Sequence, residues 1–235
     1  MKKFLSIALL AVLLITVMPV GAFAAGKLEV TQENFFVTEF GNIYGYCFAR
    51  IENTGDKRAE YSAGLFEIYD ANGDTLTSES YMSVLGDYLE PGEYGYVSVY
   101  ESIDNASTID DVDDYMLTVT GKSSSGTVTQ RFACESEWLP DYQVNDYWTS
   151  DLMTATFTNT TDETIYDVDF VLALLDDDGN ILDIEYTTTY DIGVAPGSSI
   201  TVREEVSSYM MEAIEREGFT PTHVDAFAYV YIDEE

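Results

Sequence analysis

Basic residues, histidine, cysteine and long apolar runs are scarce in this 235-residue chain. Ten Lys and Arg stand against 43 Asp and Glu, and a formal net charge of −33 repels nucleic acid and anionic lipid surfaces. The single histidine, His223, has no cysteine near it, so zinc sites and Ser-His-Asp chemistry have little support. No segment after residue 20 is apolar enough to span a membrane. We therefore expect no nucleic-acid partner and no catalytic residues.

The first 24 residues have the pattern of a secretory signal peptide. Lys2 and Lys3 precede an apolar run from Phe4 to Val20, and the small residues of Ala22-Phe23-Ala24 suit signal peptidase. A transmembrane anchor is the alternative, but the run is short for a membrane span. We expect residues 1–24 to be removed by cleavage near Ala24, leaving a secreted, extracellular protein that is not inserted in a membrane.

Aromatic residues are abundant, with 18 Tyr, 12 Phe and 2 Trp. They supply apolar surface that disordered acidic chains lack, so we expect a folded protein with a strongly anionic exterior. The length that follows the signal peptide suits two domains of roughly 100 residues each.

An internal repeat divides the chain. Asn53-Thr54 matches Asn159-Thr160 at an offset of 106, and turn residues and apolar positions recur with them. Pro91-Gly92 matches Pro196-Gly197 after a slip of one residue. We therefore predict two tandem copies of one fold, with domains at 25–136 and 137–235 and a boundary near Pro140.

Alternating apolar residues predict short strands within each copy. These residues should face a core: Cys47, Ala49, Ile51, Phe66 and Ile68 in the first copy, and Met153, Ala155, Phe157, Leu172 and Leu174 in the second. Residues 115–134 suggest a hairpin around Gly121 to Gly126. The pattern predicts an all-β fold of two tandem β-sandwich domains.

One helix is expected in the second copy, within "EEVSSYMMEAIEREGF" at 204–219. Ser207 or Ser208 suits its N-cap, and Gly218 suits its end. Its apolar stripe consists of Val206, Met210, Ala213 and Ile214. Such a stripe favours packing on its own domain, while a partner-binding helix is the alternative.

The stretch "FEIYDANGD" at 66–74 suits either a calcium loop or a turn. Counted from Asp70, Gly73 is fourth and Tyr81 twelfth, whereas an EF-hand loop needs glycine sixth and glutamate twelfth. The pattern therefore favours a hairpin turn. Weak surface sites for Ca²⁺ stay open at two acidic clusters. These are Asp176, Asp177 and Asp178, and Asp110, Asp111, Asp113 and Asp114.

Residues 48–99 carry a resemblance. Phe66-Glu67-Ile68-Tyr69-Asp70, between an Asn-Thr-Gly turn and a Pro-Gly-Glu turn, resembles the motif of the FxLYD domain, with Ile68 in place of leucine. The second copy keeps only the pattern. This resemblance implies immunoglobulin-like sandwiches and secretion from a bacterium, and it implies no catalytic residues and no cofactor.

Cys47 and Cys134 are the only cysteines. A secreted chain with two cysteines suggests a disulfide between them. The alternative is two separate buried thiols, since position 47 lies on a core face.

An aromatic stripe is the candidate binding surface. Tyr44, Tyr46 and Phe48 alternate on the side opposite Cys47, and Leu65 and Tyr69 are expected to share that outer side. Such a stripe can stack on sugar rings or grip a protein. The alternative is that "ENFFV" at 33–37 or the neighbouring domain covers it.

These observations predict a non-enzymatic interaction module of the bacterial cell exterior that binds a protein or an envelope component. The alternative is a carbohydrate-binding or Ca²⁺-binding accessory protein.

Overall fold

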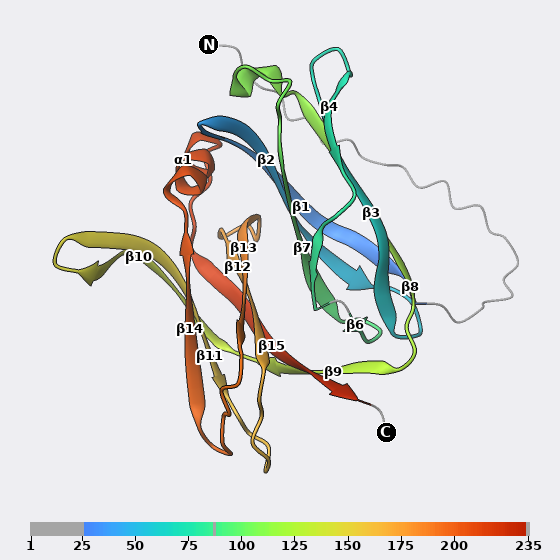
Figure 1. The fold of residues 1–235 in the computed structure, drawn as a ribbon, viewed down its shortest axis with the longest axis vertical. Coiled ribbons are helices and arrows are strands. Elements are labelled where there is room, and N and C mark those ends of the chain that lie inside the picture. Colours follow the sequence, from blue (N-terminus) through green and yellow to red (C-terminus); the bar gives the residue numbers. More distant parts are fainter. Residues whose placement is uncertain (1–25, 87, 234–235) are drawn as a thin grey trace, which may run out of the picture.

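The computed structural model describes residues 26–86 and 88–233, so the expected signal peptide lies outside the described residues. Over these described residues the chain forms antiparallel strands, one short 3₁₀ helix and one α-helix, which confirms the all-β sandwich prediction (Figure 1). No helix among the described residues is long and apolar enough to cross a membrane.

The N-terminal half contains two sheets. The inner N-terminal sheet has the order β1 (Leu28–Phe40), β2 (Asn42–Asn53), β7 (Tyr94–Ser102), β5 (Ser83–Leu85). In the outer N-terminal sheet β3 (Ala59–Tyr69) pairs with β4 (Thr75–Glu79), β6 (Tyr88–Leu89) and β8 (Asp114–Ser123). The 3₁₀ helix η1 (Ile109–Asp111) precedes β8.

The C-terminal half also contains two sheets. The outer C-terminal sheet has the order β10 (Glu135–Asn145), β11 (Trp148–Thr158), β14 (Ser199–Val206). The inner C-terminal sheet has the order β13 (Ile181–Thr189), β12 (Val168–Leu175), β15 (His223–Asp233), β9 (Thr127–Ala133). The helix α1 (Ser208–Arg216) connects β14 to β15.

A buried asparagine holds the same loop in both halves. Asn53 and Asn159 each donate through Nδ2 to the backbone carbonyl four residues ahead and to a second carbonyl 35 or 36 residues ahead, at 2.7–2.8 Å. Their own carbonyls accept from Gly92 N and Gly197 N, at 2.9 and 2.8 Å. The backbone and side-chain bonds of the two copies correspond, so the internal repeat is structural.

The aspartate turn also recurs. Asp70 and Asp176 each accept at Oδ1 from the backbone N–H groups two and four residues ahead, at 2.7–3.0 Å. Gly73 and Gly179 follow with φ of 82° and 83°, a conformation that glycine adopts without strain. The hairpin reading of "FEIYDANGD" is confirmed.

The predicted hairpin of residues 115–134 does not form. β8 pairs with β3 of the N-terminal half, whereas β9 pairs with β15 at the edge of the inner C-terminal sheet. Figure 1 shows β9 running from one half to the other. The chain therefore enters the C-terminal half at residues 124–126, ahead of the expected boundary at 136.

The side chains that alternation assigned to the core are buried as expected. Cys47, Ala49, Ile51, Phe66 and Ile68 are fully enclosed between the two N-terminal sheets. The corresponding five residues of the second copy are enclosed between the two C-terminal sheets, at Met153, Ala155, Phe157, Leu172 and Leu174.

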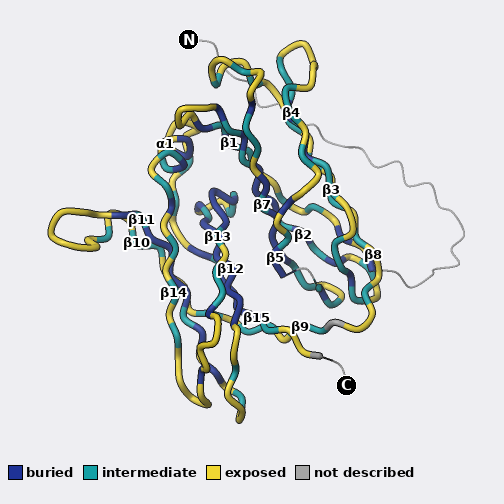
Figure 2. The backbone as a smooth tube through the Cα atoms, viewed as in Figure 1, coloured by how far each residue is buried: buried dark blue, intermediate teal, exposed yellow. Residues whose placement is uncertain are grey.

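The two inner sheets pack against each other. Phe36, Phe48, Leu85 and Tyr96, all from the inner N-terminal sheet, belong to the same hydrophobic cluster as the C-terminal core. β12 accordingly has buried side chains on both faces, and Figure 2 shows it dark over most of its length. The order of layers is outer N-terminal, inner N-terminal, inner C-terminal, outer C-terminal. That the halves are two independent domains stays a prediction.

The helix has the predicted cap and stop. The Ser207 hydroxyl accepts from Met210 N at 3.3 Å, and Gly218 ends the helix with φ of 85°. Met210, Ala213 and Ile214 are buried in the C-terminal core, so the stripe packs on its own half.

Candidate functional site

The inner N-terminal sheet has an aromatic face that points toward the C-terminal half. One part of this face is buried in the interface between the halves, and the other part is accessible. Strand register places Phe36 opposite Tyr46 and Tyr46 opposite Tyr100, so all three side chains share this face. Phe36 and Phe48 are 1–2% exposed against the C-terminal half, whereas Tyr100 is 60% exposed. The alternative that the neighbouring half covers the stripe is therefore correct for the part that contains Phe48, and Tyr100 lies beyond the covered part.

A polar and aromatic cluster fixes the two halves together. The hydroxyls of Tyr94 and Tyr96 both donate to Asp225 Oδ2, at 2.8 and 2.6 Å. The Tyr96 ring stacks on Phe227, with centroids 6.3 Å apart. The Arg131 guanidinium lies 3.3 Å from the Phe227 ring centroid, a cation–π contact. This cluster holds the inner sheets at one separation beside the open part of the aromatic face.

A cleft of about 440 Å³ lies where the inner sheets diverge. Strands β2 and β7 form one wall of the cleft, and β13 forms the other. The helix α1 and the end of β1 close one end of the cleft. The lining residues are Phe40, Tyr44, Tyr46, Phe48, Ser98, Tyr100, Asp183, Ile184, Glu185 and Tyr209.

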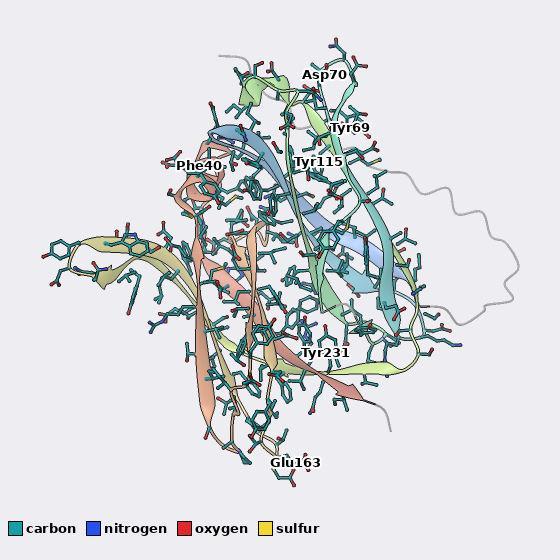
Figure 3. The ribbon with its side chains drawn as sticks, in the orientation of Figure 1. Phe40, Tyr69, Asp70, Tyr115, Glu163 and Tyr231 are labelled. Carbon is teal, nitrogen blue, oxygen red and sulfur yellow. The ribbon has the colours of Figure 1, made fainter. Side chains whose placement is uncertain are left out.

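Ring contacts order the aromatic wall. Tyr46 and Tyr100 stack with centroids 5.4 Å apart and planes 19° apart, and Tyr44 lies 6.5 Å from Tyr46. Phe40 stacks on Tyr209 of the helix at 5.5 Å. Figure 3 shows Phe40 beside α1. These contacts fix the orientation of the rings, so that flat apolar faces with polar edges line the cleft before a ligand binds.

The opposite wall is the strand β13, which carries two acids with raised pKa values. Asp183 is 5% exposed, and its Oδ1 accepts from the backbone N–H of Ile184 at 2.9 Å. Burial raises the pKa of Asp183 to about 7. Burial, followed by the charges of Asp183 and Glu204, raises the pKa of Glu185 to about 8. Strand register pairs Asp183 with Leu174 and Glu185 with Leu172, so both carboxyl side chains lie on the face of β13 that points toward the outer C-terminal sheet, away from the aromatic rings.

A second groove, of about 690 Å³, opens at another edge of the same interface. Tyr81, Tyr186 and Tyr231 line it together with Met82 and short polar residues, and none of the lining residues is charged. Its polar groups are dispersed, so the smaller cleft is the better defined site.

The predicted site residues separate into two groups. Tyr44, Tyr46 and Phe48 line the cleft together, as expected. Leu65 and Tyr69 do not join them, because β3 lies in the outer N-terminal sheet and its outward side chains point away from the C-terminal half. In Figure 3 Tyr69 lies on the far side of the N-terminal half from Phe40. Alternation predicts inside and outside, but not the sheet to which a strand belongs.

The weak calcium site left open at Asp176, Asp177 and Asp178 is not assembled. Both carboxylate oxygens of Asp176 are used within the turn, because Oδ2 accepts from Asn180 Nδ2 at 2.7 Å while Oδ1 accepts from backbone N–H groups. Asp111 likewise accepts from backbone N–H groups ahead of η1. Across residues 26–86 and 88–233, no three His, Cys, Asp or Glu side chains are placed to hold a metal ion.

The suggested disulfide is absent. Cys47 and Cys134 are free thiols, and they lie in different hydrophobic clusters, one in each half. Burial raises the pKa of the Cys134 thiol to about 12 and also raises that of Cys47. A domain boundary at 136 places both cysteines in the first copy, whereas β9 carries the chain to position 134 in the C-terminal half.

Sequence reasoning missed the acids Asp183 and Glu185 of β13 and the helix residue Tyr209. A usable signal exists in "ILDIE" at 181–185, where Asp183 interrupts an apolar strand and Glu185 follows two residues later on the same face. Acids at inward strand positions are uncommon, so they mark a functional candidate.

Comparisons with known proteins name no family. No family model matches the chain, and no curated protein matches it. Among solved structures, red sea bream transglutaminase aligns with a TM-score of 0.21 and 14% identity, over 87% of this chain and 31% of that chain. The chain thus spans less than a third of that structure's length, and so low a score carries no argument about function.

Proposed function

We propose that the protein is a secreted, non-enzymatic binding module of the bacterial cell exterior, and that it holds an envelope component in the cleft between its inner sheets. The observation that supports this most is the preformed aromatic wall, in which the rings of Tyr46 and Tyr100 are stacked and line the cleft. Ligand sites combine apolar rings with a few convergent polar groups in this way. The resemblance of residues 48–99 to the FxLYD domain agrees with secretion from a bacterium.

Carbohydrate binding is the second candidate. The exposed ring of Tyr100 beside the half-buried ring of Tyr46 offers a flat surface on which a sugar ring can stack. A glycan array separates the two candidates. Binding of the protein to a neutral glycan on the array would favour carbohydrate as the ligand itself.

The test is retention of the protein by purified cell-envelope material. The Tyr100→Ala variant should lose most of this retention, because it removes one aromatic face without opening the core. Tyr147→Ala is the matched control, since Tyr147 is 98% exposed at the tip of the β10–β11 hairpin. Equal retention of wild type and Tyr100→Ala would contradict the proposed site, and release of a chemically altered product would contradict a non-enzymatic role.

A further inference from the structure

A pocket of about 350 Å³ lies between the inner sheets, displaced along β2 and β7 from the cleft. Its titratable lining residues include Arg50 of β2 and His223 and Asp225 of β15, and none of its lining residues also lines the cleft. A pocket of this volume suits a small organic molecule. The side chains that line it therefore form a site of their own.

The arginine of this pocket has no anionic partner within the protein. The Arg50 guanidinium lies over the Tyr94 ring, 3.8 Å from the ring centroid. Among residues 26–86 and 88–233, no carboxylate forms an ion pair with Arg50, although the chain contains 43 Asp and Glu. A guanidinium that stacks on a ring keeps its N–H donors in its own plane, where a carboxylate can accept two of them.

The opposite charge comes from Asp225 on the other inner sheet. The hydroxyls of Tyr94 and Tyr96 both donate to Asp225 Oδ2, at 2.8 and 2.6 Å, and no described residue donates to Oδ1. Arg50 thus lies on the face of the Tyr94 ring while Asp225 lies at its hydroxyl. The ring separates the two charges, and they do not form an ion pair with each other.

The turn that borders the pocket is also fixed. Gln32 donates through Nε2 to the Gly179 carbonyl, and Asn34 donates through Nδ2 to the Ile181 carbonyl at 3.0 Å. These bonds join the turn between β12 and β13 to β1. Because the pocket is held in place before a ligand arrives, little ordering remains to be done when one binds.

The two charges select among ligand chemistries. An anion would be repelled by Asp225 and by the net charge of −33, and a cation would be repelled by Arg50. A neutral molecule would offer a full charge to neither residue. An α-amino acid offers a carboxylate that matches the guanidinium and an ammonium that offsets Asp225. Its net charge is zero, so the anionic surface does not repel it.

We infer that this pocket binds an α-amino acid as its zwitterion, with the carboxylate on Arg50 and the ammonium on Asp225. Leu175 also lines the pocket and offers apolar surface to the side chain of the amino acid. The inference does not depend on the proposed function, because the cleft and this pocket have no lining residue in common.

Calorimetric titration with three matched probes tests the inference. The probes are L-leucine, 4-methylpentanoate, which lacks the ammonium, and L-leucinamide, which lacks the carboxylate. Leucine should saturate one site per chain, and each of the other probes should bind at least about tenfold more weakly. Because the zwitterion has no net charge, its affinity should change by less than about threefold between about 0.05 and 0.5 M NaCl.

Variants of Arg50 test the carboxylate contact. Arg50→Gln should weaken leucine binding by about tenfold or more, and Arg50→Lys by about threefold or more, because lysine keeps the charge but loses the planar pair of donors. Arg203→Gln is the matched control, since the Arg203 guanidinium also lies over a tyrosine ring, that of Tyr142 in the outer C-terminal sheet, 5.7 Å from the centroid. Circular dichroism confirms that each variant is folded. Should Arg50→Gln unfold, the three probes on the wild type decide the test.

The inference would be overturned by the absence of saturable leucine binding up to about 10 mM. It would also be overturned if 4-methylpentanoate or leucinamide bound as tightly as leucine, or if a folded Arg50→Gln variant bound leucine as well as the wild type does. Any of these results leaves the proposed function standing, because envelope retention is tested at Tyr100 in the cleft. Leucine binding without envelope retention would support the amino-acid site and refute the envelope partner.

Discussion

Replacing Asn159 by alanine removes four hydrogen bonds from a fully buried side chain. Its Nδ2 donates to two backbone carbonyls at 2.7 Å, and its Oδ1 accepts from the N–H and the hydroxyl of Thr161 at 2.9 and 2.7 Å. At about 1 kcal/mol net for each bond, the free energy of unfolding should fall by about 4 kcal/mol. Asn53 also makes four side-chain bonds, so Asn53→Ala should cost about as much.

Urea unfolding measures both losses, and two optical probes locate them. Both tryptophans, Trp138 and Trp148, lie in the C-terminal half, so their fluorescence reports that half, whereas far-ultraviolet circular dichroism reports both. Because side chains of the inner N-terminal sheet share the C-terminal core, we expect one cooperative transition. Asn53→Ala should therefore lower the midpoint seen by fluorescence as well as the one seen by circular dichroism.

The control is Asn42→Ala, since Asn42 is exposed and its change should stay within about 0.5 kcal/mol. A loss below about 1 kcal/mol in both buried variants would refute the reasoning that these side chains hold the repeated loop. A fluorescence midpoint that Asn53→Ala does not move would show instead that the halves unfold independently.

Three further predictions concern single sites. Without reductant, Cys47 and Cys134 should both take up iodoacetamide after denaturation and neither should in the native state; a denatured chain that resists labelling would contradict free thiols. Folding raises the pKa values of Asp183 and Glu185 from their usual 3.8 and 4.5, so the native state binds more protons at these two groups than the unfolded state does. The free energy of unfolding should therefore fall as pH rises from about 4.5 to about 8. Glu185→Gln should flatten that decline, and an unchanged slope would refute the buried acid pair. Gly95→Ala should destabilise the fold by more than about 1 kcal/mol, since its Cβ would lie 2.6 Å from a backbone oxygen of β5; a melting temperature equal to wild type would contradict that contact.

Much of each half was predictable because strand alternation and turn chemistry are local. Cys47 and Phe66 lie on the core faces that their spacing assigns, and Asp70 with Gly73 forms the expected turn. The helix also followed from its sequence, because a serine cap, an apolar stripe and a terminal glycine coincide.

The arrangement of the halves was not predictable, because it depends on contacts between residues far apart in sequence. Phe48 and Phe227 pack in one cluster although the repeat places them in different copies. For the same reason the sequence pattern groups residues 127–133 with the first copy, whereas β9 pairs in the C-terminal half, and it does not show that Tyr69 lies in another sheet than Tyr46. The cleft exists only where the two inner sheets diverge, so no single strand pattern contains it.

The account depends on the face-to-face packing of the inner sheets, and a double-mutant cycle on Tyr96 and Asp225 tests that packing most directly. The Tyr96 hydroxyl donates to Asp225 Oδ2 at 2.6 Å across the interface. In urea unfolding of Tyr96→Phe, Asp225→Ala and the double variant, the account predicts a coupling energy of about 1.5–3 kcal/mol, as for a hydrogen bond to a charged group. Losses that add to within about 0.5 kcal/mol would contradict the interface and the cleft that it forms.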